Sequence, residues 1–193
     1  FNGIYDCFNL CDTVGNIKIM SKSLKANYTK GSVAGGKDKF SKSGPAKKGV
    51  IICNACDIFY YKKTWKLDAH SFIMKRENKN LAVSHAICPA CAMIKGGQYK
   101  GRITVKNVPD EQKGDLLNLI KGFCDRAFER DPLSRLIDIL QDGSVLAITV
   151  TDNQMAQRLA KKIKDAFNKV KLSIASGNAP GDPVNITVEF LEK

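Results

Sequence analysis

Residues 88–105, CPACAMIKGGQYKGRITV, join two different kinds of sequence. They begin with a Cys-x-x-Cys pair (Cys88 and Cys91), pass through Gly96-Gly97 and continue into alternating apolar residues from Gly101. A CxxC pair can hold two thiolates close together, adjacent glycines favour a turn, and alternation indicates a strand. The stretch therefore predicts a metal-binding module that ends in a turn, followed by a domain that begins with a strand.

A second CxxC pair, Cys53 and Cys56, lies upstream. Together the two pairs supply the four soft ligands that a tetrahedral structural Zn²⁺ takes. Such a site has no open position for a substrate, so we expect one structural zinc and no catalytic metal. The segment between the pairs has strand character over 57–65, which predicts a hairpin with a longer loop at its tip. Residues 50–100 are therefore expected to form a zinc ribbon.

Other interpretations of these cysteines and of a nearby histidine remain open. One CxxC pair alone could be a redox pair, and His85 could replace one of the thiolates. Cys124 lies beside an apolar helical stripe and is expected to be a small core residue. The chain has seven cysteines, an odd number, which argues against a simple disulfide framework and for a reducing compartment. We therefore expect a cytoplasmic protein.

Residues 101–193 alternate between strand and helix patterns. The order of these patterns is β-α-β-β-α-β plus one strand, which predicts an α+β, ferredoxin-like domain with two helices on one face of an antiparallel sheet. The extra C-terminal strand is expected to extend an edge of the sheet as a hairpin with the fourth strand. The expected strands cover 101–108, 135–140, 145–150, 169–175 and 184–190; one helix runs from Pro109-Asp110-Glu111 to Asp131-Pro132, and Thr151 or Asp152 caps the second.

The positive charge is unevenly distributed. The 193 residues carry a net charge of +12. Residues 1–50 have nine basic and three acidic residues, 51–100 have eight and three, and 101–193 have fourteen and thirteen. This asymmetry indicates that one half of the molecule contacts a polyanion, although a solvated basic tail is the alternative.

The N-terminal part, residues 1–49, is expected to be a flexible arm. Its segment 21–48 is rich in Lys, Gly and Ser and has too few large apolar residues to bury a core. Residues 1–19 are more apolar and lack the pattern of a signal peptide. We expect Met20 to be the start of the protein, with residues 1–19 not native; a short docking segment is the alternative.

The basic residues of the arm and module are candidates for phosphate contact. Lysine and arginine interleaved with aromatic residues such as Phe59, Tyr60 and Trp65 can pair with phosphates and stack on unpaired bases. The candidate RNA-binding residues are Lys37, Lys39, Lys42, Lys47, Lys48, Lys62, Lys63, Lys66, Lys75, Arg76, Lys95, Lys100 and Arg102.

Two stretches of the sequence resemble a known family. CPACAMIKGGQYKGRITV (88–105) and DGSVLAITVTDNQMAQRLAKKIKDAF (142–167) resemble the nonsense-mediated-decay-three family of large-ribosomal-subunit export adaptors. Bacterial zinc-ribbon relatives of that family are more fully similar, through Tyr60 and Trp65 after the first CxxC and a Pro-Leu-x-Arg run, here Pro132–Leu136. The resemblance covers about residues 51–193. It implies a zinc ribbon beside a ferredoxin-like domain that binds the large ribosomal subunit through rRNA. The later domains of the adaptors are missing, so nuclear export is not implied.

The expected function is that of a ribosome-associated factor that binds rRNA of the large subunit in hibernation, anti-association or assembly. A DNA-binding or transcription-associated zinc ribbon is the alternative. An enzyme is not expected, since phosphate-loop and HExxH motifs and a convincing nucleophile with a histidine partner are missing. No membrane partner is expected, because no stretch approaches the roughly 20 apolar residues of a membrane span. No small-molecule substrate is expected, because a closed four-cysteine site leaves no open position for one.

Overall fold

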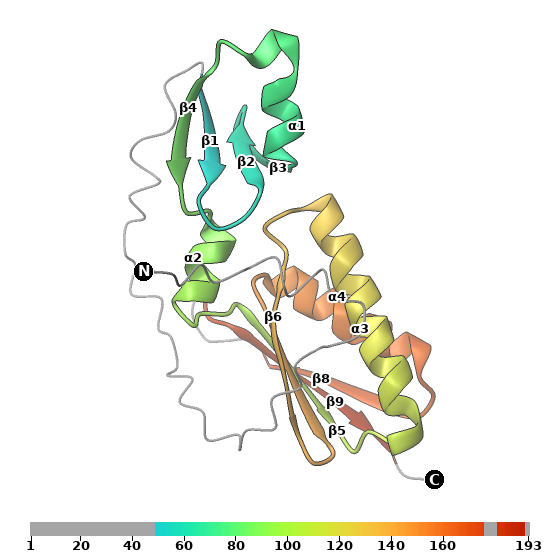
Figure 1. The fold of residues 1–193 in the computed structure, drawn as a ribbon. Helices are drawn as coiled ribbons and strands as arrows, with labels where there is room; N and C mark the ends of the chain where they lie inside the picture. Colours follow the sequence, from blue (N-terminus) through green and yellow to red (C-terminus); the bar gives the residue numbers. More distant parts are fainter. Residues whose placement is uncertain (1–48, 176–180, 192–193) are drawn as a thin grey trace, which may run out of the picture.

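The computed structural model describes residues 49–175 and 181–191. The protein is a mixed α+β structure with two separate sheets (Figure 1). The smaller sheet belongs to residues 49–86, and the larger one to residues 101–190. The short helix α2 (Pro89–Lys95) lies between them; of the second CxxC pair, Cys88 is its N-cap and Cys91 lies in its first turn. The predicted arm, including Met20 and the candidate residues Lys37, Lys39, Lys42, Lys47 and Lys48, lies outside the described residues.

The smaller sheet is built from four short strands in the order β3-β2-β1-β4. Strands β1 and β4 are parallel, and the other neighbours are antiparallel. A short helix, α1, and a 3₁₀ turn, η3, connect the hairpin to the last strand. The bounds are β1 (Gly49–Cys53), β2 (Ile58–Tyr61), β3 (Thr64–Leu67), α1 (Ala69–Met74), η3 (Arg76–Asn78) and β4 (Ala82–Ala86).

The predicted hairpin is present, but the prediction of a longer loop at its tip is wrong. Strands β2 and β3 pair directly, and only Lys62 and Lys63 connect them. The remaining residues of the insert form α1, η3 and β4 instead. Helix α1 begins here because the Asp68 side chain accepts a hydrogen bond from the Ser71 N–H at 2.9 Å, an N-cap contact. The cysteine cluster is compatible with a zinc ribbon, whereas the module around it contains more helix than two hairpins would.

The larger sheet has five strands in the order β6-β7-β5-β9-β8. Along the chain the elements follow the predicted order of strand, helix, two strands, helix and two strands. Their bounds are β5 (Gly101–Lys106), α3 (Asp110–Arg130), β6 (Leu136–Asp142), β7 (Val145–Val150), α4 (Asn153–Ala166), β8 (Val170–Ala175) and β9 (Val184–Phe190).

The place predicted for the extra strand is wrong. Strand β9 forms the expected antiparallel hairpin with β8, but it also pairs in parallel with β5. It therefore lies inside the sheet, and β8 forms the edge. The sheet is consequently mixed rather than antiparallel. The burial patterns give the reason: β9 buries Val184, Ile186, Val188 and Phe190, whereas most of β8 is exposed. The more apolar strand takes the covered position.

Both long helices cover the same face of this sheet (Figure 1), as predicted. Helix α3 buries Leu116 and Ile120 there, and α4 buries Leu159 and Ile163. Cys124 is in this core, as predicted. Asp152 caps α4 by accepting a hydrogen bond from the Met155 N–H at 2.9 Å. The strands contribute further buried residues to this core, among them Ile103, Val105, Ile139, Leu146, Ile148, Val150, Ile186 and Val188.

Glycine is required where β5 passes beneath α4. A Cβ atom on Gly101 would lie 2.4 Å from the Cβ of Ala156 and 2.9 Å from Cγ2 of Val150. The missing side chain thus allows the strand and the helix to come close together.

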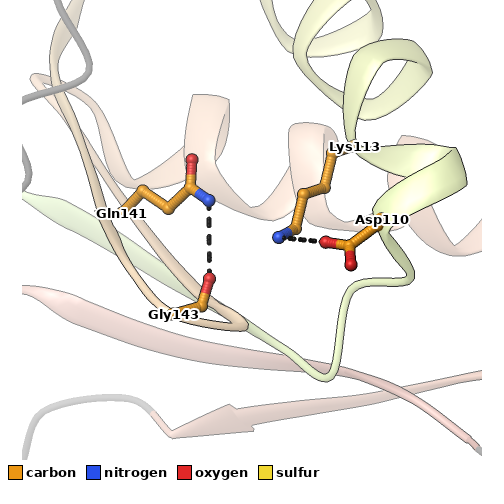
Figure 2. A network of polar contacts seen from close by, with 4 residues as sticks. All are labelled: Asp110, Lys113, Gln141 and Gly143. Atoms are coloured by element: carbon orange, nitrogen blue, oxygen red, sulfur yellow. Dashed lines mark hydrogen bonds and ion pairs between the residues drawn. The ribbon is translucent and has the colours of Figure 1, made fainter.

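Two polar contacts lie at the end of the larger domain farther from α2 (Figure 2). Lys113 Nζ pairs with Asp110 Oδ1 at 2.6 Å in the first turn of α3, and Gln141 Nε2 donates to the Gly143 carbonyl at 3.4 Å. Both contacts are local in sequence, since the partners lie three and two residues apart. In the described ranges 49–175 and 181–191, no helix has the length and apolarity needed to cross a bilayer.

Candidate metal centre

The four CxxC cysteines meet at one end of the smaller sheet. Strands β1 and β4 run in parallel, so both end on the same side, where β1 ends at Cys53. Cys56 follows in the loop before β2. The chain leaves β4 and reaches Cys88, the N-cap of α2, and Cys91 lies in the first turn of that helix. The second pair therefore lies at a helix start rather than on a hairpin knuckle.

The spacing of the sulfur atoms fits a tetrahedral metal site. All four Sγ atoms lie within 4.8 Å of one another, with Cys56 and Cys88 3.8 Å apart and Cys56 and Cys91 3.5 Å apart. A tetrahedron with Zn–S bonds of about 2.3 Å has S···S edges of about 3.8 Å. The four cysteines are reduced, so these distances belong to a thiol cluster. The residues present can therefore hold one metal ion with four sulfur ligands.

Backbone amides support negative charge on the sulfurs. Cys53 Sγ accepts hydrogen bonds from the N–H groups of Ala55 at 3.4 Å and Cys88 at 3.3 Å, and Cys88 Sγ accepts one from the Cys91 N–H at 3.3 Å. Contacts of this kind favour the thiolate, which is the form that binds metals. They also fix the orientation of the sulfurs before a metal arrives.

The thiols also interact strongly with one another. Hydrogen bonding from Cys56, and then from Cys88 and Cys91, lowers the pKa of Cys53. The contact with Cys53 raises the pKa of Cys56, but the contacts with Cys88 and Cys91, with a smaller contribution from Arg135, outweigh it and lower the value to about 6. The pKa values of Cys88 and Cys91 are raised, mainly by Cys53. The first CxxC pair is thus the more easily ionised one.

Arg135 brings a positive charge from the larger domain to this cluster. Its guanidinium donates from Nη2 to Cys56 Sγ at 3.2 Å and from Nη1 to Cys91 Sγ at 3.4 Å. Its Nε donates to the Pro132 carbonyl at 2.8 Å, and its guanidinium carbon lies 5.0 Å from the Phe128 ring centroid. The side chain is therefore held on three sides, and with a metal bound it would partly offset the charge of four thiolates.

The segment that carries Arg135 is itself fixed. Thr151 Oγ1 accepts a hydrogen bond from the Arg135 N–H at 2.8 Å and donates one to the Leu133 carbonyl at 2.6 Å. Leu133 and Phe128 pack against the cysteine cluster, as do Trp65 and Leu67 from β3. The cysteine cluster thus also lies where the two parts of the protein contact each other.

His85 is not part of the centre. It lies exposed on β4, whereas the cluster that could bind a metal consists of Cys53, Cys56, Cys88 and Cys91. The sequence identified these four ligands from their spacing. It did not assign a role to Arg135, although the Pro132–Leu136 run was noted, because the contacting cysteines lie 44 and 79 residues away in the chain.

The structure divides the described basic candidates between two places. The first group is exposed at or near the hairpin turn and the end of α1, and consists of Lys62, Lys63, Lys66, Lys75 and Arg76. The turn and the end of this helix lie at the end of the module opposite the cysteines (Figure 1). Lys95, Lys100 and Arg102 lie where α2 leads into β5; the two lysines are exposed and Arg102 is half-buried. The structure therefore does not bring them all together on one patch.

Aromatic residues accompany the first group but have different roles. Phe59 is buried and stacks on Phe72 with ring centroids 4.3 Å apart. Tyr60 and Trp65 contact each other across the hairpin, with centroids 5.4 Å apart. Tyr61, the last residue of β2, is half-buried beside the turn.

Comparison with known proteins gave no relative: no family model and no curated protein matches the chain.

Proposed function

We propose that the cysteine cluster holds one Zn²⁺ in a structural role, within a module of the zinc-ribbon type. Four thiolates are the usual set for a structural zinc, and no coordination position remains for a substrate. The metal would be bound by Cys53 and Cys56, which lie at and just after the end of β1, and by Cys88 and Cys91, which follow β4. When bound, it crosslinks β1 and α2 in a module that has little apolar core of its own. The role of the centre is therefore binding and folding rather than catalysis.

We further propose that the protein binds rRNA of the large ribosomal subunit and acts on the ribosome in the cytoplasm. The observation that carries this proposal is the concentration of charge on the metal-binding module. Residues 51–100 have eight basic residues against three acidic ones, whereas residues 101–193 are almost neutral. A folded, rigid surface with an excess of positive charge favours a polyanion partner.

The basic side chains of the module are available for contact. In the described part of the chain, no ion pair holds Lys62, Lys63, Lys66, Lys75 or Arg76, and all five are exposed. The module also contains aromatic rings beside these charges, which suits RNA with unpaired bases better than a regular duplex. Its helices α1 and α2 have six and seven residues and offer little length for reading a DNA groove. These features, with the resemblance of residues 51–193 to ribosome-binding families, favour RNA over DNA.

The proposal is tested by sedimentation of native lysate, with detection of the protein in the free, small-subunit, large-subunit and whole-ribosome fractions. We expect the protein in large-subunit fractions at low salt and its release as salt increases, because phosphate contacts exchange counterions. Binding of purified protein to rRNA fragments and to duplex DNA is then compared at one salt concentration. Equal affinity for the two polymers, with no protein in ribosomal fractions, would contradict the proposal. The fraction that contains the protein in growing and in starved cells separates assembly from hibernation.

A further inference from the structure

We propose that a basic hollow on the metal-binding module binds one unpaired RNA nucleotide. The hollow is lined by Tyr61, Lys62, Phe72, Lys75, Glu77 and Asn78. This inference rests on the proposed RNA-binding function. It makes that function more specific, because it assigns one binding site on the protein and requires the bound RNA to be single-stranded. A base in a duplex is stacked between its neighbours and cannot enter such a hollow, whereas an unpaired base can be turned out and held.

Two separate segments form the walls of the basic hollow. Tyr61 and Lys62 come from the end of β2 and the hairpin turn. Phe72 comes from α1, Glu77 and Asn78 come from η3, and Lys75 lies between that helix and η3. Asn78 Nδ2 donates to the Phe72 carbonyl at 2.8 Å, which ties η3 back to α1 and fixes the loop that carries Lys75. The Tyr61 and Phe72 rings, with centroids 4.9 Å apart, join the two walls. The hollow is thus part of the folded module.

The lining groups match the parts of a nucleotide. Lys62 and Lys75 present ammonium groups that can pair with the phosphates on either side of a base. Tyr61 presents an aromatic ring on which a base can stack. Glu77 supplies an acceptor that a ribose 2′-hydroxyl can reach as a donor, and this hydroxyl distinguishes RNA from DNA.

Lys62 would have to move when a base stacks on Tyr61. In the structure its Nζ atom lies 5.4 Å from the Tyr61 ring centroid, a cation–π contact. At an exposed site this contact is weaker than the stacking of a base on an aromatic ring. Lys62 can therefore leave the ring for a phosphate, which exchanges one favourable contact for two.

The backbone of the turn supports a binding role for the lysine pair. Lys62 and Lys63 have φ angles of 49° and 69°, so both lie in the left-handed region. A two-residue hairpin with this geometry favours Asn-Gly, and lysine at both positions destabilises it. A residue choice that opposes the local backbone preference is typical of a functional position.

The test uses the full-length, metal-loaded protein and a fluorescent single-stranded oligouridylate of about 12 nucleotides, near the site size of single-strand binders. Fluorescence anisotropy gives the affinity at several salt concentrations. Removing both charges in Lys62→Ala/Lys75→Ala should weaken binding at least about tenfold and lower the salt slope by about 1 to 1.5, at 0.7 per phosphate. The matched control removes two exposed lysines of α4, Lys161→Ala/Lys162→Ala, and should change the affinity less than about twofold.

Two more variants separate stacking and turn geometry from charge. Tyr61→Leu keeps an apolar side chain and should weaken binding about 5- to 100-fold with no change in salt slope. Lys62→Asn/Lys63→Gly should raise the melting temperature while it weakens binding, a combination that general unfolding cannot produce. A duplex RNA of equal length should bind more weakly than the single strand.

The outcomes are distinct for this inference and for the proposed function. If wild-type protein sediments with the large subunit but the Lys62/Lys75 variant binds the oligonucleotide like its control, the hollow is wrong and the proposed function stands. Unchanged binding by Tyr61→Leu likewise overturns the nucleotide assignment. If wild-type protein binds neither the subunit nor the oligonucleotide, both proposals fail.

Discussion

Replacing Arg135 by glutamine should weaken metal binding although Arg135 is not a metal ligand. The arginine donates to Cys56 Sγ at 3.2 Å and to Cys91 Sγ at 3.4 Å. Four thiolates and one divalent ion together carry a charge of about −2, and a nearby guanidinium offsets half of it. Glutamine keeps a polar side chain at this position but removes the charge and the forked pair of donors.

The size of the effect follows from these two contacts. A hydrogen bond to a charged group contributes about 1.5–3 kcal/mol. A full unit-charge interaction at about 4 Å near a protein surface gives about 4 kcal/mol, which is a ceiling. Because Arg135 is only half-buried, water replaces part of what is lost. We therefore expect a loss of about 1.4–2.8 kcal/mol, which is a 10- to 100-fold lower metal affinity and the usual range for outer-shell residues.

The assay is competition for Zn²⁺ with a chelator of known affinity at fixed pH. Arg130→Gln is the matched control, because Arg130 is exposed near the end of α3 and its Nε donates only to the Arg126 carbonyl, at 3.1 Å. Arg135→Lys keeps the charge without the fork, so its affinity should lie between those of wild type and Arg135→Gln. Equal zinc affinity of wild type, Arg135→Gln and Arg130→Gln would refute the reasoning. Melting of the metal-free proteins shows whether the effect requires metal.

Three further predictions concern the metal, the core and pH. Purified protein should contain one Zn²⁺ per chain by elemental analysis, and a chelator should expose Cys53 and Cys88 to alkylation; no metal together with freely alkylated native cysteines would contradict this. Gly101→Ala should destabilise the protein by about 1–3 kcal/mol in urea unfolding through overpacking, whereas Gly114→Ala, which has open space in α3, should stabilise it by about 0.5–1 kcal/mol. Burial raises the pKa of Asp138, although a hydrogen bond from the Ile139 N–H opposes this shift. The native state therefore binds the carboxyl proton more tightly than the unfolded state does. As a result, the stability of the protein falls as pH rises through the carboxyl range. Asp138→Asn should accordingly raise the melting temperature at pH 7 and have little effect at pH 3; the same shift at both values would exclude this cause.

The elements of the larger domain could be predicted because their signals are local. Asp110 and Glu111 mark the start of α3, Asp142-Gly143 marks the hairpin, and alternation marks β9. The order of strands in the sheet depends on contacts between distant residues, and a hairpin of β8 and β9 can join β5 through either strand. In the sequence, β9 alternates four large apolar residues (Val184, Ile186, Val188 and Phe190) and β8 three (Val170, Leu172 and Ile174), so the pattern favours β9 as the inner strand only slightly.

The four candidate ligands could likewise be found from spacing alone, but their surroundings could not. Strand β4 is almost entirely exposed, so it shows no alternation between buried and exposed positions. Helix α1 has only six residues, and the single local signal for its start is the N-cap residue Asp68. The approach of Arg135 to the sulfurs depends on how the larger domain packs against the module, through Phe128 and Leu133. No pattern within a short window of sequence contains that information.

The central position of β9 also has a consequence for synthesis of the chain. Strand β5 is made first among the strands of the larger sheet and β9 last, yet the two are neighbours along their whole length, from Gly101 opposite Val184 to Lys106 opposite Glu189. Until Phe190 has left the ribosomal tunnel, one side of β5 has no partner and β8 has no strand to join. The four cysteines that could hold a metal, by contrast, are all present once Cys91 has been made. A growing chain can therefore bring this cluster together well before the larger domain is able to close.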